Sequence, residues 1–461
     1  MGLPDNRVTA QLARHVAHFP AESVPADVIE CTKRSLLDAL GVTLAASRLG
    51  DAAAPFVAMA REARGAGPVP VVGMGFSAPA SLAALANGAL AHALDFEDTH
   101  DAAIVHPYAA TIPAALSALA GREASGLEFL ASIAHGANLV CRVSLAMQHN
   151  PEPDGWFLNP MLNAYGAAAA AARLMGATPE AMESAFSLTF AQATCSTNVK
   201  YTPGSVFRAV RDGFNAQGGY VAAALASAGT VGFNGTFDPP HGFYELYSKG
   251  LVDLDQLAGE LDTRWENRAI SYKPWPSCRG THAFVEAALD ILSRPGFSMD
   301  RVEEVTVRVS PFYATLCHPK EEKCAPKTAP EAKFSIPFVL ATALLRNRVS
   351  LDDFDAAALA REDVPALARR IKVDVDESIG LRDAMGGGVT IRTGDGAVWR
   401  HDVTEPRGST ANPMSDAEFE AKFLACAERA LVPPSGAARL AELVMGLDRA
   451  KSASVLLDAL R

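Results

Sequence analysis

The chain has 461 residues, of which 49% are hydrophobic and 20% charged, as is ordinary for a protein of about two or three domains that stays in water. Its net charge of −11 argues against nucleic acid or an anionic membrane as a partner, because either requires a basic surface. The seven cysteines form no CxxC pair, no signal peptide is recognisable, and no run approaches the roughly 18 apolar residues of a membrane span. We therefore expect reduced thiols and a cytoplasmic location.

The first part of the chain, from about residue 5 to 260, is predicted to be helical. Alanine-rich segments repeat their apolar residues with a period of about 3.6, and strand signals are almost absent. So much alanine lets helices approach closely, which favours an orthogonal bundle over a long coiled coil. The predicted helices are 26–46, 81–98, 109–121, 127–149, 164–175 and 179–193.

The pattern changes near Trp265. Three later segments alternate apolar and polar residues with the period of a strand, and the last contains a Gly-Asp-Gly hairpin turn. Helical patterns lie between them. The predicted strands are 301–316, 371–378 and 386–403, and the predicted helices are 282–292 and 335–345.

Helical patterns return after Pro406, and these C-terminal helices are expected to pack against the first domain. We therefore predict a mainly α fold. A large all-helical domain is built from both chain ends, residues 1–266 and 406–461. A smaller α+β domain, residues 267–405, is inserted between them.

The stretch from Asn87 to Pro107 is the strongest candidate for chemistry. It reads NGALAHALDFEDTHDAAIVHP and gathers four carboxylates and three histidines. Carboxylates at a helix C-terminus face the negative end of the macrodipole and are unfavourable there. Such broken local rules tend to mark functional or strained sites.

The spacing within this stretch places its side chains on different faces of the predicted helix. In a helix that continues to residue 98, His92, Asp95 and Thr99 share one face. Glu97 and Asp98 then point elsewhere and are interpreted as solvated. A lone histidine among alanines is more often a hydrogen-bonded core residue than a ligand, so His92 is not included in the candidate site.

Motifs spread over nearly the whole chain resemble those of one family. They are ALAHALDFEDTH followed by His106-Pro107, SLLDALGVTLAA (35–46), GAAAAAARLMG (166–176), YKPWPSCRGTH (272–282), PEAKFSIPF (330–338) and EPRGSTANPMSDAEFEAKF (405–423). In this order they resemble the MmgE/PrpD family, which includes 2-methylcitrate dehydratase, cis-aconitate decarboxylase and iminodisuccinate epimerase. The resemblance implies the same two-part layout, with the smaller domain as a lid, and a homodimer.

The resemblance also assigns roles in the first motif. Asp95, Thr99 and His106 match the family's active-site loop. Asp95 would orient or contact the substrate, Thr99 would donate a hydrogen bond to it, and His106 would act as an acid or base. The alternative for His106 is a loop histidine that merely caps the next helix.

Further candidates come from the predicted lid. Lys273 matches the family's K-x-x-P-x-C pattern and is a candidate for carboxylate binding or proton transfer, whereas the alternative is a surface lysine. Cys278 and His282 are supporting candidates for substrate binding. Tyr313 corresponds to a family tyrosine with a catalytic role, although a strand tyrosine packs as often as it reacts.

Two departures from the family pattern concern proton transfer. Phe157 stands where the family's G-F-H-P motif has histidine, and Arg208 stands where relatives have lysine, with Arg211 as a second guanidinium. Arginine binds carboxylates in a bidentate way but does not exchange protons at neutral pH. The change suggests altered chemistry such as epimerisation. The alternative is that both arginines are ordinary charges on a helix surface.

Neither a cofactor nor a metal is expected. The chain has no GxGxxG after a strand, no P-loop and no HExxH, so its own side chains must suffice. The main alternative is a metal site built from Asp95, Asp98, His100, Asp101 and His106, but their spacing is unfavourable.

The sequence therefore predicts a cofactor-independent lyase, of dehydratase or decarboxylase type. It would act on a small di- or tricarboxylic acid by removing a proton next to a carboxylate, a step that needs a base and cationic or hydrogen-bond donors. One alternative is an epimerase or isomerase of a substituted succinate-type acid. Another is a family member that binds carboxylates without catalysis.

Overall fold

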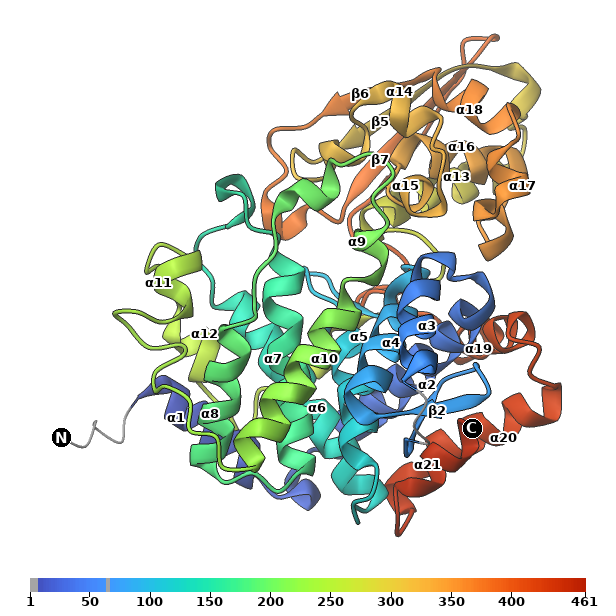
Figure 1. The fold of residues 1–461 in the computed structure, drawn as a ribbon. Helices are drawn as coiled ribbons and strands as arrows, with labels where there is room; N and C mark the ends of the chain where they lie inside the picture. Colours follow the sequence, from blue (N-terminus) through green and yellow to red (C-terminus); the bar gives the residue numbers. More distant parts are fainter. Residues whose placement is uncertain (1–6, 64–66) are drawn as a thin grey trace. The chain divides into compact units, whose positions relative to one another are not determined.

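Helices dominate the structure. The computed structural model describes residues 7–63 and 67–461. Helices make up 58% of the described residues and strands 9%, which confirms the predicted mainly α fold (Figure 1). Within the described ranges, no helix is long and apolar enough to cross a membrane.

The chain packs into two units. The large unit contains Met1–Ala93, Glu97–Ile270 and Phe419–Arg461, and the small unit contains Leu94–Phe96 and Ser271–Glu418. The three residues Leu94–Phe96 thus belong to the small unit although the chain on both sides of them belongs to the large one. The sequence pattern contains no sign of this excursion.

The large unit is a helical bundle. Its helices are α1 (Val8–His18), α2 (Ala26–Leu49), α3 (Ala54–Glu62), α4 (Ala80–Ala93), α5 (Pro107–Leu119), α6 (Gly126–Leu145), α7 (Leu158–Leu174), α8 (Pro179–Phe190), α9 (Phe207–Val210), α10 (Asp212–Ser227), α11 (Phe243–Tyr247), α12 (Leu254–Ala258), α19 (Asp416–Arg429), α20 (Pro434–Met445) and α21 (Ser454–Ala459). A short antiparallel hairpin of β1 (Val69–Val71) and β2 (Phe76–Ala78), which the sequence pattern does not predict, belongs to the same unit.

Helix α7 forms the centre of this bundle. It is buried from Asn159 to Leu174 and packs against α5, α6 and α10. Small residues make these approaches possible: a Cβ atom at Gly219 of α10 would lie 2.5 Å from that of Ala167 on α7. The alanine-rich composition is therefore the direct cause of the close helix packing.

Helix α4 is shorter than the sequence predicts. The expected helix 81–98 ends at Ala93, and Asp95 has a φ of +49°, a left-handed conformation that a continuing helix does not allow. The prediction that His92, Asp95 and Thr99 share one helical face is therefore wrong. Thr99 lies instead in the short strand β3 (Thr99–His100).

The small unit is built on a four-stranded sheet in the order β6-β5-β7-β8. The strands are β5 (Val302–Val309), β6 (Ile371–Val375), β7 (Gly387–Thr393) and β8 (Val398–Val403), with β6 parallel to β5 and the other pairs antiparallel. The helices are α13 (His282–Ser293), α14 (Lys320–Cys324), α15 (Ala329–Lys333), α16 (Ile336–Arg346), α17 (Ala356–Leu359) and α18 (Asp363–Ala368). Helix α13 packs against β7 and β8, and the short strand β4 (Ile270–Ser271) leads into the unit.

Tyr313 does not lie on a strand. The predicted strand 301–316 ends at Val309, and Tyr313 begins a 3₁₀ helix, Tyr313–Leu316. The alternating pattern stops where Ser310 and Pro311 follow the strand, because proline cannot donate to a strand ladder.

The C-terminal segment Phe419–Arg461 belongs to the large unit. Helix α20 contacts α2, and Lys422 of α19 forms a buried ion pair with Asp38 of α2, with Nζ and Oδ1 2.6 Å apart. Both chain ends therefore contribute to one core.

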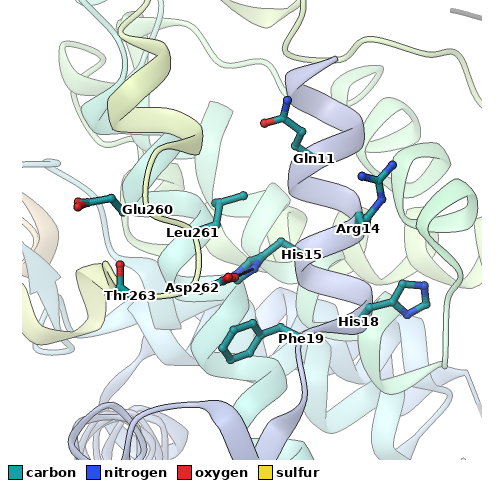
Figure 2. A pocket seen from close by; sticks show the side chains of 9 residues that line it. All are labelled: Gln11, Arg14, His15, His18, Phe19, Glu260, Leu261, Asp262 and Thr263. Atoms are coloured by element: carbon teal, nitrogen blue, oxygen red, sulfur yellow. Dashed lines mark ion pairs between the residues drawn. The ribbon is translucent and has the colours of Figure 1, made fainter. Parts of the chain in front are cut away.

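Two histidines lie together in the large unit, His135 buried and His15 half-buried. His15 of α1 and His135 of α6 have ring centroids 5.0 Å apart, and His135 also contacts Trp265 at 4.8 Å. Burial lowers the pKa of His15 to about 4, although Asp262, 3.3 Å from Nδ1, opposes the shift. Figure 2 shows His15 beside Asp262 in a surface pocket between α1 and residues 260–263.

These histidines make the stability of the protein depend on pH. Between pH 6.5 and about 4 the unfolded chain binds a proton at His15 and the folded chain does not, so the free energy of unfolding falls as the pH falls through this window. His15 alone lowers the free energy of unfolding by about 3 kcal/mol at most across this window. Urea denaturation from pH 4 to 8 should show a flatter dependence for His15→Gln than for the wild type. The same substitution at the exposed His241 should change nothing, and a wild-type slope in His15→Gln would refute the assignment.

Candidate active site

The family motif in the large unit folds into a loop between α4 and α5. Glu97 and Asp98 are fully buried, so their interpretation as solvated acids is wrong. The reason is the early end of α4, which removes the helical spacing on which that interpretation depended. His106 ends the loop as the N-cap residue of α5.

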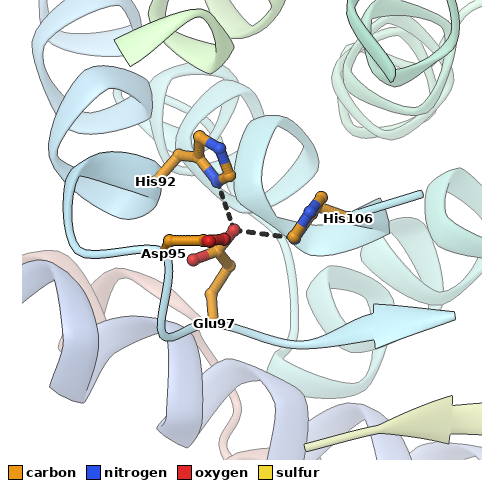
Figure 3. Close-up of side chains that lie close together, drawn as sticks. All are labelled: His92, Asp95, Glu97 and His106. Atoms are coloured by element: carbon orange, nitrogen blue, oxygen red, sulfur yellow. Dashed lines mark hydrogen bonds and ion pairs between the residues drawn. The ribbon is translucent and has the colours of Figure 1, made fainter. Parts of the chain in front are cut away.

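Glu97 connects two histidines (Figure 3). Its Oε1 lies 2.8 Å from Nδ1 of His106 and also forms a hydrogen bond with Nδ1 of His92. The two imidazole rings are 4.8 Å apart, and Nδ1 of His106 lies 3.1 Å from the carbonyl oxygen of Asp98. His92 is buried as expected for a core residue, yet it belongs to this cluster, which the sequence prediction excluded.

Arg211 extends the cluster. It is only 2% exposed, and its guanidinium forms hydrogen bonds with Nε2 of His92 and, at 2.5 Å, with the carbonyl oxygen of Arg208. The neighbouring Asp212 accepts hydrogen bonds from Asn163 and Asn215 at 2.8 and 2.9 Å. Arg211 is therefore not an ordinary helix-surface charge, whereas Arg208 is half-buried.

Three cations surround Phe157, the residue that stands in place of the family's histidine. Lys200 Nζ lies 4.6 Å from the centre of its ring, and the guanidinium carbons of Arg211 and Arg208 lie 5.3 and 6.0 Å from it. A ring face stabilises such cations. The large unit thus has a local concentration of positive charge despite the net charge of −11.

Thr99 makes a local contact. Its hydroxyl donates a hydrogen bond to Asp101 Oδ1 at 2.9 Å, and its side chain is buried. The role of Thr99 as a donor to the substrate stays a prediction.

In the small unit, two buried lysines hold the segment Leu94–Phe96. Lys273 donates to Asp95 Oδ1 at 2.6 Å and to the Asp95 carbonyl at 2.8 Å, and Lys333 donates to the Leu94 carbonyl at 2.6 Å. Lys273 is fully buried, so the alternative of a surface lysine is wrong. The sequence analysis did not identify Lys333, although it lies within the PEAKFSIPF motif.

The remaining predicted residues lie around the YKPWPSCRGTH segment. The Cys278 amide donates to the Lys333 carbonyl at 3.0 Å, and His282 Nε2 lies 3.2 Å from the Ser277 carbonyl. Tyr313 lies against Gly280, where an added Cβ would be 2.4 Å from the tyrosine ring.

A buried arginine that the sequence analysis missed, Arg279, ties this segment to the next motif. It donates to the carbonyl oxygens of Pro406 and Arg407 at 3.1 and 2.7 Å. The sequence motifs could have indicated this contact, because Arg279 and both acceptor residues lie inside motifs of the family.

The residues present do not favour a metal. His92, Glu97 and His106 offer nitrogen and carboxylate atoms of the kind that metal ions bind. However, the positive guanidinium of Arg211 already occupies Nε2 of His92, and a second cation nearby would be repelled. The arrangement is better described as a hydrogen-bonded network.

Asp98 is a buried acid, and burial favours its neutral form. Burial raises the pKa of Asp98 well above its usual value, and the carboxylates of Asp38 and Glu97 raise it further. A neutral carboxyl group is tolerated there because an isolated charge in the core is costly.

Asp98→Asn should therefore stabilise the protein at neutral and alkaline pH. In the wild type, stability is lost as the pH rises above the pKa of the unfolded acid, by about 1.4 kcal/mol for each unit by which the folded pKa is raised. Asparagine has the shape of the neutral acid and removes this loss, so the gain in Tm measured by calorimetry should be larger at pH 8 than at pH 5. Asp38→Asn, which removes a paired carboxylate, should lower Tm at both values. An equal fall in Tm for Asp98→Asn at both pH values would show that Asp98 is ionised.

Comparisons with known proteins agree with the resemblance seen in the motifs. The cis-aconitate decarboxylase-like protein oryM of Aspergillus oryzae is 27% identical over 98% of this chain and 97% of its own length. A cis-aconitate decarboxylase of Aspergillus terreus is 25% identical over 98% and 96%, and the human cis-aconitate decarboxylase is 23% identical over 83% and 80%. The MmgE/PrpD N-terminal domain matches residues 10–253, and the MmgE/PrpD C-terminal domain matches residues 275–449. The chain therefore belongs to the MmgE/PrpD family.

Proposed function

We propose that this protein is a decarboxylase of a small unsaturated tricarboxylic acid of the cis-aconitate type, and that it works without a metal or organic cofactor. Membership of the family and the similarity to cis-aconitate decarboxylases identify an enzyme of the lyase type. The substrate and the kind of elimination are the proposed part.

The exposure of His106 carries the proposal. Its side chain is 14% exposed, whereas those of Glu97 and His92 are fully buried. His106 is therefore the member of this cluster that a bound acid can reach. Its Nδ1 is directed to Glu97, so proton transfer to a substrate would use the opposite ring nitrogen, Nε2.

One proton-transferring group suits decarboxylation. When the bond to the leaving carboxylate breaks, its electron pair stays on the substrate carbon skeleton and carbon dioxide departs. A single proton then completes the product, and the protonated His106 supplies it. Dehydration needs both a base for carbon and an acid for the departing hydroxyl group. In the large unit, Phe157 and Arg208, which stand in place of the family's histidine and lysine, cannot supply the second group.

The cations have a separate task. In the large unit Lys200 and Arg208 would hold the carboxylates that remain on the substrate and stabilise negative charge that develops during the reaction. The buried Arg211 would add positive charge behind them, through its hydrogen bond with His92. In the small unit, Lys273 is proposed to bind a carboxylate or to transfer a proton, and Asp95 to control its orientation through their ion pair.

A second candidate is the epimerisation of a substituted succinate. The replacement of histidine by Phe157 favours it, because the residue pattern then departs from that of the family's dehydratases and decarboxylases. A non-catalytic carboxylate-binding protein is the third alternative.

Proton NMR in D₂O distinguishes these functions directly. The purified protein is incubated with cis-aconitate, citrate, 2-methylcitrate and substituted succinates. New vinylic signals and loss of a carboxylate from cis-aconitate are expected. Deuterium next to a carboxylate without elimination would establish the epimerase instead, and inertness toward the whole panel would contradict both.

His106→Gln should reduce kcat by about 10²–10⁴-fold, the usual contribution of a general acid or base. Glutamine removes the titrating nitrogen but keeps a polar side chain. Steady-state kinetics with the substrate found above would measure the effect, and thermal unfolding would verify the fold. The exposed His241→Gln is the matched control and should retain the wild-type rate; a wild-type rate in His106→Gln would exclude His106 as the acid.

A further inference from the structure

In the cluster of Arg211, His92, Glu97 and His106, the hydrogen-bond partners determine which nitrogen of each histidine ring carries the hydrogen. Arginine has only N–H donors and no acceptor, so Nε2 of His92 must accept the hydrogen bond from Arg211. A neutral imidazole has one donor and one acceptor nitrogen. His92 therefore carries its hydrogen on Nδ1 and donates it to the carboxylate of Glu97.

The same reasoning applies to His106. Its Nδ1 lies 2.8 Å from the Glu97 carboxylate and 3.1 Å from the Asp98 carbonyl, and both oxygen atoms are acceptors. Nδ1 must therefore carry the hydrogen. In the neutral ring the lone pair then lies on Nε2, and in the protonated ring Nε2 holds the transferable proton.

We propose that Glu97 is a positioning residue that holds His106 as the Nδ1–H tautomer, and that Arg211 keeps Glu97 in place by fixing His92. The inference rests on the proposed function, in which His106 transfers the proton. Glu97 would also stabilise the imidazolium form of His106, because opposite charges 2.8 Å apart in a buried site attract strongly.

Burial supports a positioning role over a catalytic one. Glu97 and His92 are fully buried, so neither reaches a bound substrate. The charged or titratable groups close to Glu97 include Asp95, which is paired with Lys273, and Asp98, Asp212, Arg211, His92 and His106. Asp38 and Lys422, an ion pair, lie close to Asp98. Among them, Arg211 supplies the positive charge that faces the cluster through His92.

The tautomer can be measured without any substrate. The chain has 11 histidines, so ¹⁵N-histidine labelling gives a tractable spectrum, and the signals of His106 and His92 are assigned by their loss in His106→Gln and His92→Gln. Both rings of the wild type should show the Nδ1–H pattern in their two-bond nitrogen–proton correlations. An Nε2–H pattern for His106 would overturn the inference even if the protein proves to be a decarboxylase.

Glu97→Gln tests the consequence for catalysis. The variant keeps the shape of the side chain but removes its charge, so the imidazolium of His106 is less stable and the alkaline limb of the kcat/KM profile should move to lower pH by about one unit or more. We expect kcat to fall by at least about tenfold. A merely structural role would lower Tm and leave the pH profile and the His106 tautomer unchanged, which would refute the proposal.

Glu266→Gln is the matched control. Glu266 lies 3.5 Å from Nε2 of His100, another histidine of the same loop, so the variant also removes a carboxylate beside a buried histidine. The tautomer and the alkaline limb assigned to His106 should be unaffected. If Glu97→Gln does not fold, the wild-type spectrum alone decides whether the tautomer is the inferred one.

Discussion

The end of helix α4 is the constraint on which the rest of the candidate site depends. A left-handed Asp95 costs roughly 1–2 kcal/mol relative to a helical one. Lys273 and Lys333 offset this cost, because together they make three hydrogen bonds to Leu94 and Asp95, and each bond to a charged group contributes about 1.5–3 kcal/mol. The break therefore persists, and the chain that follows it forms a loop instead of a further turn of helix.

That loop explains why so many charged groups of the motif are buried. Without helical spacing, Glu97 and Asp98 enter the core, and each is accommodated by a different mechanism. Glu97 forms a hydrogen bond with His92, lies 2.8 Å from Nδ1 of His106, and belongs to a network that ends at Arg211. For Asp98, burial raises the pKa and so favours the neutral form. Elsewhere the large unit pairs its buried charges directly, as between Lys422 and Asp38. Buried charge is thus paired, hydrogen-bonded or removed, as the low polarisability of a protein core requires.

Sequence reasoning predicted what local pattern controls. Alanine-rich periodicity identified α2, α5, α6, α7 and α8, and alternation identified the strands of the small unit. Local sequence pattern did not predict the end of α4, because the lysines that stabilise the break are 178 and 239 residues away from their acceptors along the chain. The periodicity also could not predict that Glu97 is buried. The spacing of residues shows which helix face a side chain occupies only where the helix continues, and α4 ends before Glu97.

Family motifs recovered part of what periodicity missed. They identified His106 and Lys273, which local pattern alone would assign to a cap and a surface. They did not identify Glu97, Lys333 or Arg279, although all three lie inside the motifs. These residues act on the protein's own backbone or on another side chain, and that role depends on distances that only the folded chain provides.

The two departures from the family pattern have one physical consequence. Phe157 cannot exchange a proton, but its ring face lies close to Lys200, Arg208 and Arg211. A histidine at this position would compete with these cations for hydrogen-bond acceptors and would be repelled by them when protonated. The aromatic ring instead attracts them. The substitution therefore removes a group that can transfer a proton and keeps three cations close together, so that a chain of net charge −11 has a local region of positive charge.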